Sequence, residues 1–414
     1  MKDPIFKRLL ELHPKFSDLS LTRINKLLKK LNFSEKKLPQ VIHIAGTNGK
    51  GSTASILKSI LNEHGQTTHI YSTPHLVRFN ERIQLYSKDI PDKLLLKYLY
   101  HCEKVNQKKL ITYFEITTAA ALMAFQDHPA DFLILEVGLG GRFDATNIIR
   151  GKKYSLITPI SMDHQDYLGN TLSKIAFEKL SIFHNTSINF INYQKPTVKR
   201  FAKDFLNKKK IRAQFAGINW KVRNQLYIDQ DHKINLKHLS LKGFHQFENA
   251  GLAIAAVKGI LKKQFDSKLV ENALPKVRWY GRLQKIDSGE LTKVIHKYDS
   301  IFLDGFHNID GVKVFINNLK GKNNFLVCSF LVNKNYKTIL KLLAPYFKKI
   351  FVTPMDEENS IQIIDINKTN KISTSDGLLK SIDDLNQEAT SNSTIYFGGS
   401  LYFIGEVLKF NKKK

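Results

Sequence analysis

Cysteine is nearly absent from this sequence of 414 residues: only Cys102 and Cys328 occur, far apart and without a CxxC pair. A disulfide framework and a cysteine zinc site are therefore excluded, and a reducing cytoplasm is the expected location. Long apolar runs are also missing, because no stretch reaches the roughly 18 residues that a membrane-spanning helix needs. The first eight residues carry charges where a signal peptide needs an apolar segment, so no export signal is expected.

Acidic residues are scarce relative to basic ones. Asp and Glu number 37 against 64 Lys and Arg, which gives a net charge of +27. Such a charge attracts anions of any kind, including nucleotides and polyanionic small molecules. The lysines are spread over every segment, and basic residues alone do not specify a nucleic-acid surface. We therefore expect small-molecule partners, with neither nucleic acid nor a membrane among them.

The remaining composition is that of an ordinary globular protein, with 42% hydrophobic and 24% charged residues. Short apolar runs alternate with segments of helical composition. Strands are predicted at 41–45, 69–71, 131–137 and 154–158, and helices at 53–64, 114–126 and 249–261. This alternation predicts an α/β fold with a mostly parallel sheet and helices on both of its faces.

Two further regions differ from this pattern. Residues 185–245 carry short alternating runs with polar breaks, which predicts an antiparallel side element. A second α/β unit is predicted from about residue 300, with strands at 300–304, 325–328, 350–352 and 394–397. The turn signal at residues 287–290 indicates a domain boundary nearby. We divide the chain into a domain at 1–296 and a smaller, Rossmann-like α/β domain at 297–414.

A glycine-rich segment follows the first predicted strand and precedes the first predicted helix. It reads Gly46-Thr47-Asn48-Gly49-Lys50-Gly51-Ser52. Glycines let the backbone approach a phosphate closely, and the amides at a helix N-terminus stabilise negative charge. In such a loop the lysine reaches the β- and γ-phosphates and the serine hydroxyl binds Mg²⁺. The segment predicts an ATP site, although its spacing is shorter than that of the usual phosphate loop.

A carboxylate is expected beside this loop. Glu136 ends the apolar strand predicted at 131–137. The carboxyl ends of parallel strands meet at one edge of a sheet, where ligands bind. A hard oxygen at that edge suits Mg²⁺.

The glycine-rich loop resembles that of the Mur ligase superfamily, and its Gly-Ser ending resembles the folylpolyglutamate synthase and dihydrofolate synthase branch. The resemblance continues along almost the whole chain. Its other blocks are 71–83, 136–147, 163–179, 243–250, 279–283, 304–308 and 399–402. It implies an ATP-binding domain of the Mur central type at 1–296 and a glutamate-ligase-type domain at 297–414. Block 140–144 resembles members that make dihydrofolate, many of which are bifunctional.

The resemblance also implies roles for single residues. It implies metal ligands for two Mg²⁺ ions at Ser52, Thr73, Glu136 and His164, where Thr73 keeps the hydroxyl of the family's usual Ser. It implies nucleotide contacts at Asn249, Arg282, Asp304 and His307. It implies substrate contacts at His75, Arg78, Arg82, Arg142 and Asp144. On physics alone, His164 would be a core or proton-transfer histidine, since imidazole is an unusual ligand for Mg²⁺.

Lys179 lies in the block Ala176-Phe177-Glu178-Lys179. The resemblance implies that this lysine is carbamylated, which turns a cation into an anion suited to orienting a metal or its water. A carbamate requires a neutral amine and CO₂, so the site must lower the lysine pKa. With Lys50 and His164, Lys179 completes the expected catalytic set.

These expectations combine into a monomeric ATP-dependent ligase. It is expected to phosphorylate the carboxylate of dihydropteroate or a folate and to let the amine of L-glutamate displace the phosphate. A second interpretation is a Mur-type ligase that acts on another acid. A third, from a different class, is a basic NTPase that binds nucleic acid.

Overall fold

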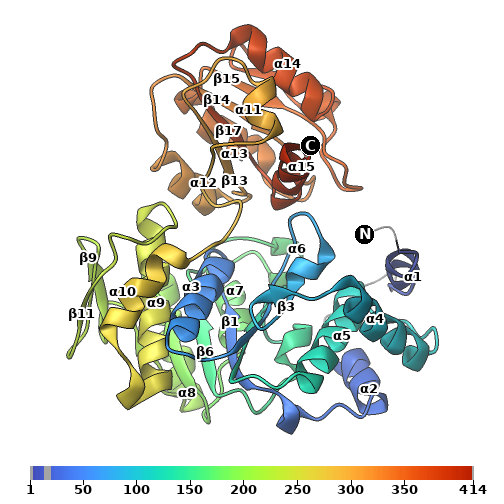
Figure 1. The fold of residues 1–414 in the computed structure, drawn as a ribbon, viewed down its shortest axis with the longest axis vertical. Coiled ribbons are helices and arrows are strands. Elements are labelled where there is room, and N and C mark those ends of the chain that lie inside the picture. Colours follow the sequence, from blue (N-terminus) through green and yellow to red (C-terminus); the bar gives the residue numbers. More distant parts are fainter. Residues whose placement is uncertain (1–2, 14–19, 413–414) are drawn as a thin grey trace. The chain divides into compact units, whose positions relative to one another are not determined.

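The structure is a computed structural model that describes residues 3–13 and 20–412 (Figure 1). The chain forms two compact units. The first consists of Met1–Pro74, Arg78–Ser240 and Gln246–Val277, and the second of His75–Val77, Leu241–His245 and Arg278–Lys414. Residues 278–296, which precede the predicted boundary at 296/297, group with the second unit. The reason is that strand β12 (Gln284–Ile286) pairs antiparallel with β13 (Ser300–Asp304).

Within the described residues, the first unit contains an eight-stranded sheet in the order β4-β3-β2-β5-β1-β6-β7-β8. Its strands are β1 Gln40–Ala45, β2 Thr68–Tyr71, β3 Ile83–Leu85, β4 Lys88–Asp89, β5 Phe132–Glu136, β6 Tyr154–Ile157, β7 Ile188–Ile191 and β8 Gln214–Phe215. All neighbouring strands are parallel except for the β2–β3 and β3–β4 pairs. The predicted α/β class with a mostly parallel sheet is confirmed.

The centre of this sheet is buried on both faces, as parallel sheets require. Strands β5 and β6 are buried at every position, and β1 at every position after Gln40. In the register, Ile44 of β1 lies beside Glu136 and Ala45 lies beside Ile157. The carboxyl ends of β1, β5 and β6 therefore meet at one edge, from which the candidate site is built.

Helices cover the sheet of the first unit (Figure 1). The α-helices are α1 Ile5–Glu11, α2 Thr22–Lys30, α3 Lys50–Glu63, α4 Asp92–Asn106, α5 Tyr113–Asp127, α6 Gln165–Leu168, α7 Leu172–Leu180, α8 Pro196–Lys209, α9 Phe244–Leu261 and α10 Ser267–Ala273. Short 3₁₀ turns lie at Glu35–Lys37, Phe79–Arg82, Ala145–Ile148, Lys262–Gln264 and Leu274–Lys276. Helix α5 begins with a capping box between Thr112 and Glu115 and is buried along most of its length.

The predicted side element at 185–245 is smaller than expected. Strands β7 and β8 with helix α8 extend the main sheet in parallel, so this half of the prediction is wrong. Only β9 (Lys221–Arg223), β10 (Leu226–Ile228) and β11 (Lys233–Asn235) form an antiparallel sheet. It lies beside α10 in Figure 1. These strands have one buried residue each, whereas β7 carries the buried run of a central strand.

The described residues of the second unit form a six-stranded sheet in the order β12-β13-β17-β14-β15-β16, in which only β12 is antiparallel. The remaining strands are β14 Asn324–Cys328, β15 Lys349–Val352, β16 Ile372–Thr374 and β17 Thr394–Gly398. The helices are α11 Glu290–Val294, α12 Ile309–Ile316, α13 Tyr336–Leu343, α14 Leu378–Glu388 and α15 Leu401–Asn411, with 3₁₀ turns at Ala344–Tyr346 and Ile363–Asp365. The four predicted strands of this unit are confirmed.

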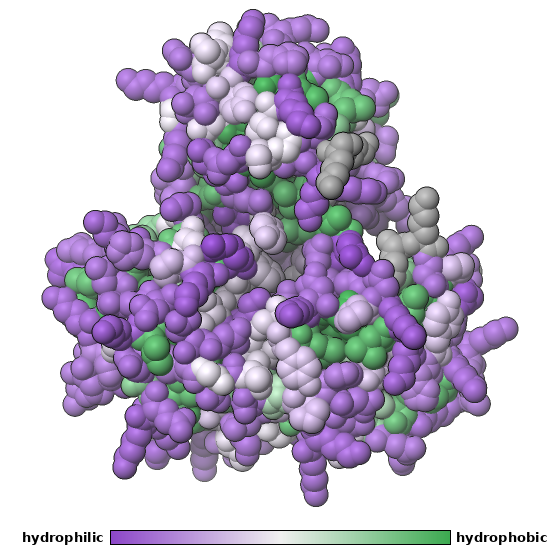
Figure 2. Space-filling model, viewed as in Figure 1, coloured by the Kyte–Doolittle hydropathy of each residue, from purple (hydrophilic) through white to green (hydrophobic). Residues whose placement is uncertain are grey.

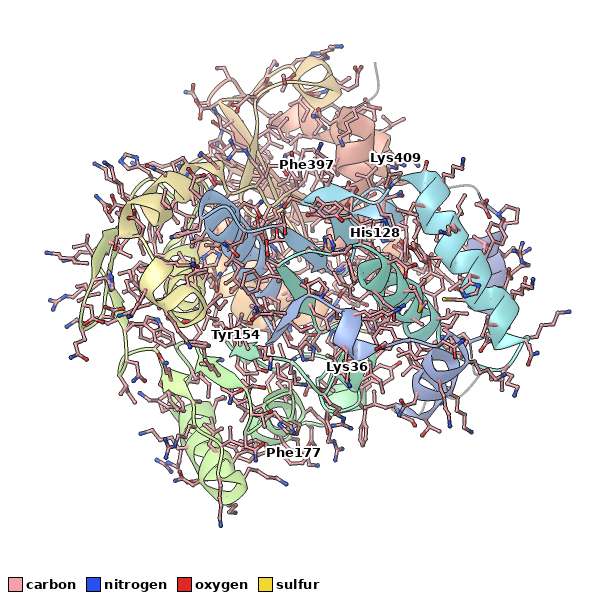
Figure 3. All side chains as sticks on the ribbon, turned by 60° about the horizontal axis from the view of Figure 1, so that its bottom comes forward. Lys36, His128, Tyr154, Phe177, Phe397 and Lys409 are labelled. Carbon is pink, nitrogen blue, oxygen red and sulfur yellow. The ribbon has the colours of Figure 1, made fainter. Side chains whose placement is uncertain are left out.

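The visible face of the molecule is mostly hydrophilic (Figure 2). Side chains ending in nitrogen lie all around the periphery in Figure 3, where Lys36 and Lys409 mark two distant parts of the sequence. Lysines and arginines occur throughout both units of the chain. Among the described residues, every helix is too short or too polar to cross a lipid bilayer.

Candidate active site

The glycine-rich segment forms the turn between β1 and α3, as its sequence predicts. Gly46 and Gly49 adopt φ angles of 147° and 89°, which L-residues with a side chain rarely adopt. A Cβ on Gly49 would lie 2.6 Å from Oδ1 of Asn249. Glycine at this position therefore lets Asn249 of α9 pack against the loop, and a hydrogen bond of 3.0 Å to Gln246 holds the Asn249 amide.

Part of the loop is tied to the segment that follows β6. The amides of Thr47 and Asn48 donate to the Pro159 carbonyl, at 2.9 and 3.3 Å. The Thr47 hydroxyl donates to the Ser161 carbonyl and accepts from the Ser161 amide. These donors are used inside the protein, so any phosphate would have to be met by other amides of the loop and by Lys50. Ser52 lies buried in the first turn of α3.

Lys50 folds back over the loop toward Glu136. Its ammonium donates to the carbonyls of Gly46 and Thr47, at 3.2 and 3.3 Å, and lies 4.0 Å from Oε1 of Glu136. The other carboxylate oxygen of Glu136 accepts from the Thr73 amide at 3.3 Å. Glu136 is only 3% exposed. The structure thus brings together Lys50, Glu136 and Thr73 at the carboxyl edge of the sheet.

Lys179 reaches the same loop from the last turn of α7. Its amine donates to the Gly46 carbonyl at 2.8 Å, and the residue is 5% exposed. Burial, reinforced by the charge of Lys50, lowers the pKa of Lys179 to about 7, although Asp163, Asp144 and Glu178 act in the opposite direction. A large fraction of this amine is therefore neutral near pH 7.

The loop that follows Glu136 lies flat against α7. A Cβ on Gly141 would lie 2.6 Å from the Glu178 carbonyl and 3.1 Å from Cα of Lys179. The Arg142 amide donates to that same carbonyl at 2.9 Å. Helix α7 is itself capped by Thr171, whose hydroxyl accepts from the Lys174 amide. Glycine at position 141 therefore allows this loop to approach α7 closely.

Asp144 holds its own loop rather than facing open solvent. It is 5% exposed, and burial raises its pKa. Its Oδ1 accepts from the Thr146 amide at 3.0 Å and from the Thr146 hydroxyl, and its Oδ2 accepts from the Leu139 amide at 2.8 Å. A carboxylate offers about four acceptor directions. The Thr146 amide and hydroxyl and the Leu139 and Gly138 amides use these directions inside the loop, so the predicted substrate contact would have to compete with them.

The three predicted substrate arginines are already engaged. Arg142 forms an ion pair of 2.8 Å with Glu178. Its guanidinium lies 4.2 Å from the ring centre of Phe143 and 5.1 Å from that of Phe177. Phe177 is labelled in Figure 3. Arg78 is exposed and pairs with Asp92 at 2.6 Å. Arg82 is buried, with its guanidinium 5.1 Å from the Phe79 ring centre. A substrate carboxylate would compete with Glu178 for Arg142.

His164 begins helix α6 with a φ of 50°. Its side chain is 38% exposed, and its Nε2 lies 3.8 Å from Oδ2 of the buried Asp163. Of the two roles expected for His164 on physics alone, the core position is therefore wrong, and the proton-transfer role stays a prediction. Asp163 links this pair to the rest of the site through its electrostatic effect on Lys179.

Three of the predicted nucleotide-binding residues lie together in the second unit. The Arg282 guanidinium donates to the Gly305 carbonyl at 3.2 Å, and Nδ1 of His307 lies 3.0 Å from the same oxygen. The Asp304 carboxylate ends β13 and accepts from the Leu283 amide at 2.9 Å. Burial raises the pKa of Asp304 to about 6, against the opposing charge of Arg282. His75 also belongs to this unit.

Sequence reasoning does not single out some of the residues on which this geometry depends. It identifies Asp163 only as the neighbour of His164, and Gln246 only as part of a block. His43, in the middle of β1, contacts Thr146 of the loop that follows β5. A polar residue inside the apolar run at 41–45 is the available signal for this contact.

The chain is similar to known proteins over most of its length. Residues 44–257 match the Mur ligase middle domain. The chain is 30% identical to the dihydrofolate synthase/folylpolyglutamate synthase of Bacillus subtilis, and the match covers 94% of each chain. It is 32% identical to the protein of the same name from Haemophilus influenzae, over 80% of this chain and 78% of the relative.

Solved structures share the fold of both units. Folylpolyglutamate synthase of Mycobacterium tuberculosis, complexed with ADP and AMPPCP, superposes with a TM-score of 0.86 and 26% identity, over 99% of this chain and 98% of that one. The Escherichia coli FolC protein in complex with DHPP and ADP gives a TM-score of 0.85 and 25% identity, over 99% of this chain and 97% of that one.

Proposed function

Because the chain belongs to the dihydrofolate synthase/folylpolyglutamate synthase family of Mur ligases, which are ATP-dependent enzymes that form an amide bond with glutamate, we propose that it joins L-glutamate to dihydropteroate, to a folate, or to both. One observation carries this proposal. The loop at 46–52 places Lys50 within 4.0 Å of Glu136, and its Gly46 carbonyl accepts a hydrogen bond from the Lys179 amine. This arrangement of two lysines and a buried carboxylate suits transfer of a phosphoryl group.

The reaction requires the acceptor carboxylate to become an acyl phosphate, because a carboxylate anion resists attack by an amine. Catalysis of phosphoryl transfer is mostly positioning and neutralisation of charge. Lys50 would supply a positive charge to the β- and γ-phosphates after leaving the carbonyls that it contacts here. Asn249 would meet the nucleotide from α9, and Arg282, Asp304 and His307 remain predicted nucleotide contacts. The glutamate amine then displaces phosphate from the acyl phosphate.

The residues near the phosphate loop fit a magnesium ion. Glu136 is buried with a cation close by, and the hydroxyls of Ser52 and Thr73 belong to the segments next to it. These are hard oxygen donors of the kind that Mg²⁺ prefers. Ser52, Thr73 and Glu136 would hold one ion, and Glu136 with His164 a second. Bound Mg²⁺ neutralises and orients phosphate oxygens.

Lys179 would act as a carbamate. Its buried amine, with a pKa of about 7, meets the requirement that the amine be neutral before it adds CO₂. A carbamate would exchange the like charges of Lys179 and Lys50 for an opposite pair. It would also give the site a second anionic oxygen group beside Glu136.

Acceptor-dependent release of ADP tests the proposed function. The purified chain would be assayed with Mg-ATP and dihydropteroate, folate, tetrahydrofolate or a UDP-sugar acid, each with and without L-glutamate. We expect turnover only with a folate-type acceptor and glutamate together. Turnover with the UDP-sugar acid alone would select a ligase for another acid, and stimulation by RNA or DNA alone would select a nucleic-acid-dependent NTPase. A monomer located in the cytoplasm is our accompanying expectation.

A further inference from the structure

A histidine interrupts the apolar strand β1 and connects it to the loop that follows β5. His43 has no exposed surface and lies between Ile42 and Ile44. Its Nε2 is 2.8 Å from the hydroxyl oxygen of Thr146, which is also fully buried. Its Nδ1 is buried and has no hydrogen-bond partner among the described residues. The contact with Thr146 is therefore the polar interaction that compensates the burial of this ring.

The direction of this hydrogen-bond chain follows from the number of protons. A threonine hydroxyl has one proton, and that of Thr146 is donated to Oδ1 of Asp144. The same oxygen atom of Thr146 must then accept from His43, so the imidazole carries its proton on Nε2. Burial and the charge of Lys152 hold the pKa of His43 well below its usual value, which keeps the ring neutral. The chain therefore runs one way, from His43 through Thr146 to Asp144.

Asp144 connects this chain of hydrogen bonds to the loop that follows β5. Its Oδ2 accepts from the Leu139 amide, three residues after Glu136, and Arg142 of the same loop donates its amide to α7. Strand β1, which carries His43, leads directly into Gly46. The chain of hydrogen bonds thus fixes the loop on the one strand that also carries the phosphate loop. Two predicted acceptor-binding residues, Arg142 and Asp144, lie in the loop that it holds.

We propose that His43 is a positioning residue for the acceptor: through Thr146 it sets the orientation of Asp144 and the conformation of residues 137–144. This inference rests on the proposed function, because it assigns the loop to acceptor binding. Without a donor at His43, the Thr146 oxygen would keep a buried lone pair unsatisfied, and its hydroxyl would be free to rotate away from Asp144. The acceptor would then meet a loop with several conformations, whereas the nucleotide would still meet Lys50 and Asn249.

Paired variants distinguish the loss of a hydrogen-bonding group from a change in side-chain size. His43→Gln keeps an N–H at the Nε2 position, whereas His43→Leu removes it. Thr146→Ser keeps the hydroxyl, whereas Thr146→Val removes it at constant shape. We expect the KM for dihydropteroate to rise about tenfold in His43→Leu and Thr146→Val, which matches one hydrogen bond of about 1.4 kcal/mol. The KM for ATP and kcat should change less than about twofold, and the Gln and Ser variants should resemble the wild type.

The double variant His43→Leu/Thr146→Val should raise the KM no further than either single change, because both break one chain. Equal losses in His43→Gln and His43→Leu, or equal effects on the KM values of ATP and dihydropteroate, would overturn the proposal. Amide hydrogen exchange supplies a readout that needs no turnover. Exchange at residues 137–146 should be faster in His43→Leu than in His43→Gln, and identical rates would also overturn it. Absence of turnover by the wild type with every folate-type acceptor would instead count against the proposed function.

Discussion

The Gly46 carbonyl oxygen accepts a hydrogen bond from the Lys179 amine at 2.8 Å, and the Lys50 amine approaches the same oxygen at 3.2 Å. Two amines therefore share one acceptor at the first residue of the phosphate loop. If both were charged, their repulsion in a buried site would be costly. A neutral or carbamylated Lys179 removes this repulsion, which links the chemistry of α7 to the loop.

Replacing Lys50 should reduce ligation strongly while the fold persists. A charge-assisted hydrogen bond is worth roughly 1.5–3 kcal/mol, and in phosphoryl transfer it acts mainly in the transition state. Lys50→Ala should therefore lower kcat by at least about 10–100-fold. Lys276→Ala, which breaks an exposed ion pair with Glu63 at the far end of α3, is the control and should keep full activity. Near-normal turnover of Lys50→Ala would remove Lys50 from the mechanism.

Lys179 variants test the carbamate directly. Lys179→Ala should be nearly inactive and partly restored by short carboxylic acids that occupy the vacated space. Lys179→Arg should be inactive as well, because it keeps a charge but does not add CO₂. Lys174→Arg, a change on the same helix, should behave as the wild type. Mass measurement under CO₂ should show the adduct, and an active Lys179→Arg variant with a bare lysine in the wild type would refute the carbamate.

Activity should depend on CO₂ and pH together. Burial lowers the pKa of Lys179 to about 7, so the neutral amine that accepts CO₂ increases as pH rises through that value. In buffer equilibrated with air we expect kcat to rise between about pH 6 and pH 8, and added bicarbonate should raise it most at the lower end. A rate that does not respond to bicarbonate at any pH in this range would argue against carbamylation.

Gly49→Ala should damage the nucleotide site beyond the strain of its backbone. Alanine in the left-handed region costs about 1–2 kcal/mol, and here its Cβ would also collide with Asn249. Gly65, which follows the other end of α3, has a φ of 76°, and nothing lies within 4 Å of the place that a Cβ would take there. Gly65→Ala should therefore show only the backbone cost. Thermal unfolding and ATP affinity of the two variants give the comparison, and equal losses of ATP affinity would exclude the Asn249 contact as the cause.

Stability should fall as the solution becomes acidic, partly through His69. Its Nδ1 accepts from the Tyr86 amide at 3.0 Å and its Nε2 contacts the His128 carbonyl at 2.8 Å, so both nitrogens are used by the neutral ring. Burial lowers the pKa of His69. The stabilisation is present above the unfolded pKa of about 6.5 and is lost as pH falls below it. Urea unfolding at about pH 7.5, 6.5 and 5.5 should show a steep decline in the free energy of unfolding as the pH falls.

In His69→Asn the free energy of unfolding should decline less steeply as the pH falls, because one histidine with a lowered pKa has been removed. It should not be flat, since the buried His43 acts in the same direction. His101→Asn, a change at an exposed position, serves as the control and should follow the wild type. Parallel curves for the wild type and His69→Asn would show that His69 contributes nothing to the pH dependence.

Local patterns in the sequence predict the strand–loop–helix around Lys50 and the position of Glu136 at a strand end, because both depend on neighbouring residues. They do not predict that the Asp144 carboxylate accepts hydrogen bonds from its own loop. Its partner, the Leu139 amide, is placed by the conformation of the turn and not by a sequence motif. Nor do they predict that β7 joins the main sheet. That outcome depends on pairing with β6, whose Tyr154 lies beside Ile188 although a whole helical segment separates the two strands in the chain.

The outermost strands of the two sheets limit how copies of this chain can meet. In the first unit the sheet ends at β4 and β8, which have two residues each, and β4 consists of Lys88 and Asp89. In the second unit it ends at β12 and β16, with three residues each. A short, charged edge offers few backbone groups for another strand to add to. The four edges of these two sheets therefore disfavour edge-to-edge pairing between copies of the chain.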